Sequence, residues 1–289
     1  MFLIGIVPRL LVFAFLITAM LSVGLQTTGN DLRHLLASKG FLFRCLLVNL
    51  AVVPAIGLLL VRSLPLTPEA AAAFLLLACT PGGISALQYS TRIKGSSLFA
   101  AGTSFVLSLG AVFISPLLLA VVLPGDIIAQ PPYGRAVLFI LLFMLLPLLG
   151  GAWGRRRWGN SAPKASILFA MFSAIFFIAV FVLVFSARKE AIHVVGGKEL
   201  LFMLMFILLS MAAGWLLGGP AKETRTVLAT VSGMRHAALC LLLAADMFPD
   251  AAVQTHIVAF SAVMIWPSTL FTGYMVLRFR KAAKAALNA

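Results

Sequence analysis

Residues 78–95 read ACTPGGISALQYSTRIKG, and this stretch decides what the chain can be. It interrupts a long apolar run, because Pro81 removes a backbone donor while Gly82 and Gly83 lower helix stability. In lipid, the freed backbone groups must find partners in protein or in a wet cavity. We therefore interpret residues 80–83 as a helix break that faces the interior of a membrane protein. A simple proline kink is the alternative.

The composition of the chain is that of a membrane protein. Of its 289 residues, 62% are hydrophobic and 10% are charged, whereas soluble domains are about 45–50% apolar and about 25% charged. A membrane span needs roughly 20 apolar residues. We expect an all-α polytopic protein of the plasma (inner) membrane with nine transmembrane helices. The predicted spans are 4–25, 41–61, 69–92 (with the break), 97–123, 136–153, 165–186, 199–218, 224–246 and 252–278.

The net charge of +14 is best explained by membrane topology. Short loops on the cytoplasmic side of a membrane protein carry an excess of Lys and Arg. Nine spans place fifteen of the 22 basic residues on the side of the C-terminus, six on the opposite side, and Arg235 within a span. This asymmetry predicts an N-terminus outside and a C-terminus in the cytoplasm, and it gives no reason to expect a nucleic-acid partner.

A second, softer break lies in residues 231–240, which read VSGMRHAALC. Ser232 and Gly233 weaken the helix, and Arg235 and His236 follow directly. Arg235 has roughly ten apolar residues on either side, so its side chain cannot easily reach the membrane surface. A charge at this depth costs about 2.5–3.5 kcal/mol on insertion scales, which marks Arg235 as a functional candidate.

The two breaks occupy corresponding places in two halves of the chain. Each is followed by a half-helix and then by a long final span, so we divide the chain into a four-span repeat at 1–124, a five-span repeat at 133–280 and a basic cytoplasmic tail at 281–289. Broken helices at matching positions of inverted repeats point to the midplane site of a secondary transporter.

Four stretches together carry a resemblance to a known family. They are TPGGISALQYSTRIKG at 80–95, SLGAVFISPLLL at 108–119, PLLGGAWGRRR at 147–157 and TRTVLATVSGMRHAAL at 224–239. Along nearly its whole length the chain resembles the bile acid:sodium symporter family, whose nine-span members lack one N-terminal helix. The resemblance implies a core domain with two crossed, broken helices and a panel domain beside it. An organic anion would bind in the crevice between them, and access would alternate as one domain moves against the other.

The resemblance also implies sodium sites, and there the sequence departs from the family pattern. Ala86 and Leu87 stand where the family has Ser-Asn, Val231 where it has a carboxylate, and Arg235 and His236 where it has Gln-Asn. Sodium is a hard cation that takes oxygen ligands. The remaining hydroxyls are neutral groups beside a fixed cation: Ser85, Thr103, Ser104, Ser108, Thr230 and Ser232.

We therefore predict that Arg235 supplies the positive charge that a bound sodium ion has in relatives. Its guanidinium would hold the two crossed, broken helices together through hydrogen bonds to hydroxyls and backbone carbonyls. It would also attract an anionic group of the substrate, helped by the positive end of a half-helix. Transport would then be sodium-independent and need no cofactor or metal. The predicted substrate or crossing site is Thr80, Pro81, Gly82, Gly83, Ser85, Ser232, Gly233, Arg235 and His236. The predicted remnant of a cation site is Ala86, Leu87, Ser104, Ser108, Thr230 and Val231.

Other functions stay open at this point. His236 could couple transport to protons, because histidine changes its charge at physiological pH, although the neighbouring Arg235 disfavours a second charge; a hydrogen-bonding role in the core is the simpler alternative. Sodium symport through rearranged hydroxyls and carbonyls, and a non-transporting sensor or scaffold, are further alternatives.

We expect no enzyme, because the acids and histidines are scattered and residues 82–86 lack the last glycine of a nucleophile elbow. The expected partners are a small organic anion and the lipid bilayer.

Overall fold

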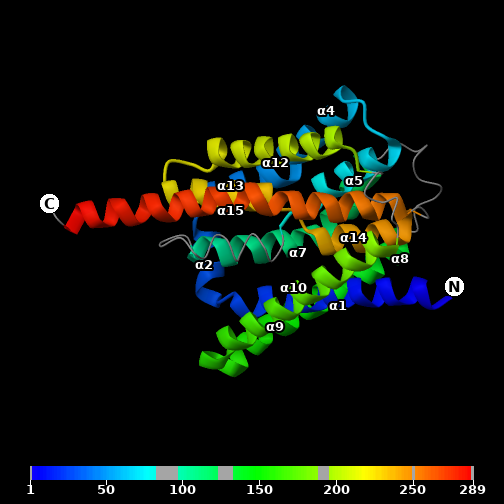
Figure 1. Ribbon diagram of the computed structural model, residues 1–289. Coiled ribbons are helices and arrows are strands. Elements are labelled where there is room, and N and C mark those ends of the chain that lie inside the picture. Colours follow the sequence, from blue (N-terminus) through cyan, green and yellow to red (C-terminus); the bar gives the residue numbers. More distant parts are fainter. Residues whose placement is uncertain (1, 83–96, 123–132, 188–194, 249–250, 288–289) are drawn as a thin grey trace.

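The computed structural model describes residues 2–82, 97–122, 133–187, 195–248 and 251–287 (Figure 1). Within these ranges the regular structure is entirely helical, with no strand. The expectation of an all-α chain is confirmed.

Most of the described helices correspond to predicted spans. The α-helices are α1 (Phe2–Gln26), α2 (Gly29–Ala37), α3 (Lys39–Leu47), α4 (Val53–Ser63), α5 (Pro68–Ala78), α7 (Ser97–Val122), α8 (Tyr133–Ile140), α9 (Leu146–Trp158), α10 (Ala162–Ala187), α12 (Gly197–Leu217), α13 (Lys222–Gly233), α14 (Ala237–Met247) and α15 (Ala251–Leu287). The π-helical segments η1 (Val48–Val52) and η2 (Leu141–Leu145) join α3 to α4 and α8 to α9, and a 3-10 turn, η3 (Gly159–Ser161), joins α9 to α10.

Each π-helical segment ends two positions before a proline, Pro54 or Pro147. Proline has no backbone N–H, so the regular pattern of helix hydrogen bonds cannot continue through it. A single widened turn accommodates the change without ending the helix, and such turns are frequent at functional sites. The short helix α2 was not predicted. It begins with a capping box in which the side chains of Thr28 and Asp31 each accept the other's backbone N–H.

Seven runs of the described residues are long and apolar enough to cross a membrane. One of them, Val137–Val184, contains both α9 and α10, which are separated by a turn at Gly159 with a φ of +48°. The third predicted crossing is represented by the 11-residue α5 alone, because its continuation lies outside the described residues. The membrane-spanning character is therefore supported, while the nine-span count and the inverted repeats stay predictions.

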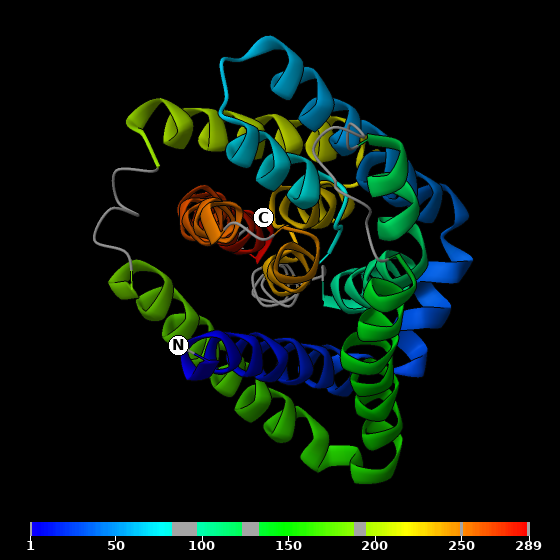
Figure 2. The ribbon, with the colours of Figure 1, turned by 90° about the vertical axis from the view of Figure 1, so that its right-hand side faces the viewer.

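Two groups of helices lie side by side (Figures 1 and 2). Helices α9 and α10 both pack along α1, and we call these three the α1 group. A Cβ atom at Gly24 would collide with the backbone of Leu148 and Gly151, so these glycines permit the close crossing of α1 and α9. We call α4, α5 and α12 to α15 the broken-helix group.

Helix α5 is held in the broken-helix group by three buried aromatic rings. Phe74 on α5 meets Phe206 on α12 and Phe260 on α15 edge to face, with ring centroids 6.0 and 5.7 Å away. This geometry is favourable for aromatic pairs. The contacts anchor α5 two turns or less before its C-terminal end, so that end has a defined position. The N- and C-termini lie at opposite ends of the bundle (Figure 1), which agrees with an odd number of crossings.

Candidate functional site

Helix α5 ends just before the predicted first break, whose second half lies outside the described residues. Helix α5 ends at Ala78, and after Thr80 and Pro81 the chain turns at Gly82, whose φ of +82° suits glycine. The last carbonyl groups of an α-helix lack the usual partner within that helix. The end of α5 therefore presents backbone oxygens to its surroundings. Four predicted site residues, Gly83, Ser85, Ala86 and Leu87, lie outside the described residues.

The second break separates α13 from α14 at residues 234–236. Met234 is extended, with φ −101° and ψ 116°. His236 caps α14, because its Nδ1 atom accepts the backbone N–H of Leu239 at 3.3 Å. The backbone N–H of His236 in turn donates to the carbonyl oxygen of Thr80 at 3.2 Å. The two breaks are therefore in direct contact with each other.

Arg235 joins the second break to the end of α5. Its side chain is 2% exposed. Nε donates to the carbonyl oxygen of Leu77 at 2.8 Å, and Nη2 donates to that of Ala78 at 2.5 Å. Nη1 donates to the amide oxygen of Asn49 at 3.0 Å. The guanidinium thus binds three oxygens, two of which belong to the helix end that the proline break creates.

These contacts explain how a buried arginine is tolerated. Among the described residues no carboxylate pairs with Arg235. Its charge instead lies beside the C-terminal ends of α5 and α13, where the helix dipole is negative. A hydrogen bond to a charged group contributes about 1.5–3 kcal/mol, so three such bonds exceed the insertion cost of about 2.5–3.5 kcal/mol. The helix break supplies the compensation that an ion pair would otherwise supply.

Asn49 is a site residue that the sequence reasoning did not place in the site. It lies in the π-helical segment η1, is fully buried, and donates through Nδ2 to the carbonyl oxygen of Cys45 at 3.1 Å and to the hydroxyl of Ser232 at 3.4 Å. It thereby links Arg235 to the last turn of α13. The sequence marks Asn49 only as a polar residue inside an apolar span, which favours a bridge between helices over a contact with substrate, and it does not select Arg235 as the partner.

Thr80 and His236 both have structural roles where the end of α5 meets α14. The hydroxyl of Thr80 bonds to the carbonyl oxygen of Leu76 at 2.9 Å and to Sγ of Cys240 at 2.7 Å. Since Nδ1 of His236 accepts an N–H, that nitrogen carries no proton in this arrangement. The buried Nε2 atom has no partner among the described residues.

The four described residues of the predicted cation-site remnant differ in their surroundings. On α7, Ser104 and Ser108 are buried, and their hydroxyls have no partner among the described residues. Ser108 lies beside Gly82, since a Cβ atom there would be 3.6 Å from its Oγ. Thr230 instead donates to the carbonyl oxygen of Thr226 in its own helix at 2.9 Å. Val231 is buried and apolar.

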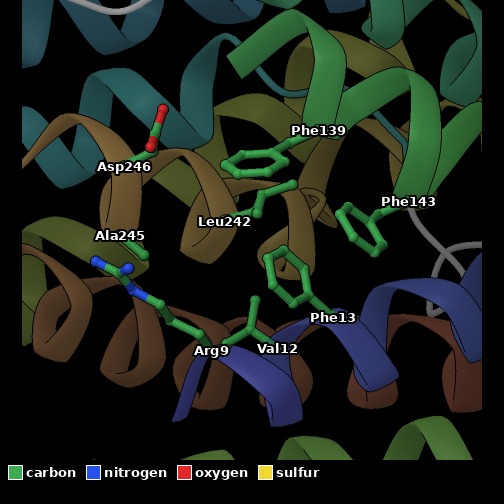
Figure 3. A pocket seen from close by; sticks show the side chains of 8 residues that line it. All are labelled: Arg9, Val12, Phe13, Phe139, Phe143, Leu242, Ala245 and Asp246. Atoms are coloured by element: carbon green, nitrogen blue, oxygen red, sulfur yellow. The ribbon is translucent and has the colours of Figure 1, made fainter. Parts of the chain in front are cut away.

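A pocket of about 160 Å³ lies between the two helix groups. Its aromatic wall is formed by Phe13 of α1 with Phe139 and Phe143 of α8 and η2, and the rings of Phe13 and Phe143 stack at 4.2 Å. Figure 3 shows Arg9 and Asp246 on the opposite side of this pocket. The sequence reasoning counted Arg9 only among the basic residues on the outer side of the membrane, because no sequence pattern connects it to the residues of α14. The pocket and the Arg235 cluster are joined by α14, which runs from one to the other.

The fold and the site define a class: a polytopic α-helical membrane protein in which the end of α5 contacts the break between α13 and α14, with a buried polar site where they meet. The chain matches the Sodium Bile acid symporter family over residues 13–195, which is more than half of its length. It belongs to that family, and the resemblance noted from the sequence is confirmed.

Two curated relatives carry transporter names. The chain is similar to the probable sodium/metabolite cotransporter BASS1, chloroplastic, of Arabidopsis thaliana, with 30% identity over 134 residues that cover 46% of this chain and 33% of the relative. It is also similar to the probable sodium/metabolite cotransporter BASS2, chloroplastic, of Oryza sativa subsp. japonica, with 22% identity over 234 residues that cover 80% of this chain and 55% of the relative. The chain thus spans about a third and about half of the lengths of these relatives.

Proposed function

We propose that the chain is a secondary transporter of small or amphipathic organic anions, located in the plasma (inner) membrane with its N-terminus outside. Family membership and the names of the two relatives support a transporter over a non-transporting sensor or scaffold. The α1 group would act as the panel and the broken-helix group as the core, and access would alternate as one moves against the other. The pocket between them is lined mainly by apolar side chains, with Arg9 and Asp246 as its two charged residues. Its apolar walls would hold the organic part of the substrate, and Arg9 would attract the anionic group.

We further propose that transport needs no sodium, because Arg235 takes the place of the cation. The observation that carries this proposal is the set of three oxygens that the guanidinium binds, Leu77 O, Ala78 O and Asn49 Oδ1. Backbone and amide carbonyl oxygens are ligands that hard cations take in proteins. A fixed positive charge on these oxygens opposes a second cation at the same place.

Sodium symport is the second candidate, and one observation favours it. The buried hydroxyls of Thr103, Ser104 and Ser108 on α7 have no partner among the described residues, and hydroxyl oxygens can coordinate a hard cation. Proton coupling through His236 has less support, because the cap on α14 uses Nδ1 of this residue as an acceptor. Protonation there would break the cap.

The test measures the purified protein in sodium and in potassium buffer. Thermal stability is recorded with bile acids, short monocarboxylates and aryl sulfonates, and each stabilising anion is then followed as uptake into proteoliposomes. We expect one anion class to stabilise the protein equally in both salts and to be taken up without a sodium gradient. Stabilisation in sodium alone would overturn the sodium-independent mechanism. Stabilisation without any flux would instead support a sensor or scaffold.

Arg235→Lys and Arg62→Gln make the matched variants for this test. Lysine keeps the charge but lacks the planar fork that reaches three oxygens, so we expect weaker anion binding and the same indifference to sodium. Arg62 is exposed in the last turn of α4, away from the site. Its variant should behave as the wild type in both salts.

A further inference from the structure

A second hollow lies within the broken-helix group, on a face that transport does not explain. It has a volume of about 660 Å³ and runs between α12 and α15. Its lining includes Leu208, Met211 and Trp215 of α12 and Trp266, Leu270 and Met275 of α15. The rings of Trp215 and Phe271 meet edge to face at 5.9 Å on its wall. The lining is apolar except at one end, where Tyr274 and Arg278 lie.

The predicted repeats pair α15 with α7, the long final span of the first repeat, and the matching residues of α7 are buried. Both α7 and α15 carry an Ile-x-Pro sequence, at 114–116 and 265–267. On α7 the residues Ser115 and Leu119 are buried, and α8 packs against that helix. On α15 the residues at the same offsets from the proline, Trp266 and Leu270, are 72% and 71% exposed. The face of α15 at the hollow is therefore exposed, whereas the residues at the same offsets on α7 are buried.

The dimensions of the hollow are those of one lipid chain. Trp266 and Arg278 are twelve residues apart on α15, which is about 18 Å at 1.5 Å per residue. Half of a hydrocarbon core about 30 Å thick is about 15 Å. The hollow thus extends through roughly one leaflet, on the side of the bundle where the C-terminus lies (Figure 1).

The charge at its end identifies the headgroup. Arg278 is exposed and donates to the hydroxyl of Tyr274 at 3.5 Å. Arg280 and Lys281 follow directly on the same helix, and both are exposed. Among the described residues that line the hollow there is no acid to neutralise this end. Basic pockets between transmembrane helices bind anionic lipid headgroups, and an arginine fork matches a phosphate with two parallel hydrogen bonds.

We propose that this hollow is a binding site for an anionic phospholipid, which places one acyl chain between α12 and α15 and its phosphate at Arg278. The proposal is independent of the transported substrate and of the coupling ion. Met211 of the lining packs against Gly233 of the second break, but the residues to be varied, Arg278 and Ala212, belong neither to the Arg235 contacts nor to the pocket at Arg9.

The test is a lipid titration of the purified full chain in detergent, read by native mass spectrometry and by thermal stability. Phosphatidylglycerol and phosphatidylcholine with identical acyl chains are compared; both carry the phosphate, but the choline cation makes the second lipid neutral overall. We expect phosphatidylglycerol to bind more tightly to the wild type, because no choline cation opposes Arg278 there. Since one basic residue near a membrane surface contributes about a fivefold change in affinity for an anionic lipid, Arg278→Gln should weaken phosphatidylglycerol about fivefold and phosphatidylcholine by less, so that the preference between the two is lost.

Two control variants test the role of the hollow and the effect of removing an exposed arginine elsewhere. Ala212→Phe fills the hollow from an exposed position on α12 and should weaken both lipids. Arg62→Gln removes an exposed arginine at the end of α4 and should change neither. Equal binding of the two lipids to the wild type, or a headgroup preference that survives Arg278→Gln, would overturn the proposal. So would a dimer in light scattering that Ala212→Phe dissociates, because the occupant would then be a second copy of the chain.

Discussion

Replacing Arg235 by alanine tests whether its guanidinium occupies a cation's place. The change leaves two buried oxygens without their donors, Ala78 O and Asn49 Oδ1, while Leu77 O still accepts from the backbone and the hydroxyl of Thr80. An unsatisfied buried acceptor costs about 1–3 kcal/mol, or roughly 2–6 kcal/mol for two. Removal of the buried charge returns about 2.5–3.5 kcal/mol. We expect a net loss of stability of about 1 kcal/mol.

The diagnostic part of this prediction is the response to sodium. With the guanidinium gone, the freed oxygens become available to an external cation. At a sodium concentration ten times its dissociation constant, binding would return about 1.4 kcal/mol. The thermal unfolding temperature of the variant should therefore rise by a few degrees when potassium is exchanged for sodium, while that of the wild type should not change.

A double variant makes the same prediction sharper. Arg235→Ala with Val231→Glu places a carboxylate at a fully buried position of α13, and a buried carboxylate strongly requires a compensating charge. Its sodium response should exceed that of Arg235→Ala alone. The reasoning is refuted if the wild type is itself stabilised by sodium, or if the double variant is no more sensitive to sodium than the wild type.

Three further perturbations test the packing around the site, each read as a change in thermal unfolding. Asn49→Leu removes one acceptor of Arg235 and should cost about 1–3 kcal/mol; a change of activity with unchanged stability would contradict its bridging role. Gly151→Leu drives a side chain into the backbone of α1 and should cost at least 1–3 kcal/mol; normal expression and stability would show that the two helices cross less closely. His256→Phe leaves Glu199 without the imidazole that lies 2.9 Å from its carboxylate, and breaking such a buried pair costs about 3–5 kcal/mol; a double variant with Glu199→Gln should recover most of that loss.

The class of protein and the places of the two breaks follow from the sequence because they depend on local properties. Apolar runs of spanning length need no tertiary contact to be recognised. Pro81 and Gly82 end α5 through their own backbone chemistry, and the structure ends that helix at Ala78. Arg235 could be recognised as unusual for the same reason, since the free-energy cost of its buried charge depends mainly on its depth in an apolar span.

The partners of these residues were decided only by the tertiary structure. Leu77 and Asn49 are 158 and 186 positions from Arg235, and nothing in the local pattern selects one buried carbonyl among many. Thr230 and Ser104, which the sequence grouped together as hydroxyls, differ in their contacts because the orientation of each helix fixes where a side chain points. The pocket at Arg9 forms for the same reason, because it exists only where α1 meets α14. Helix breaks are local events that the sequence determines, whereas the set of oxygens around a buried charge is a property of how the helices pack.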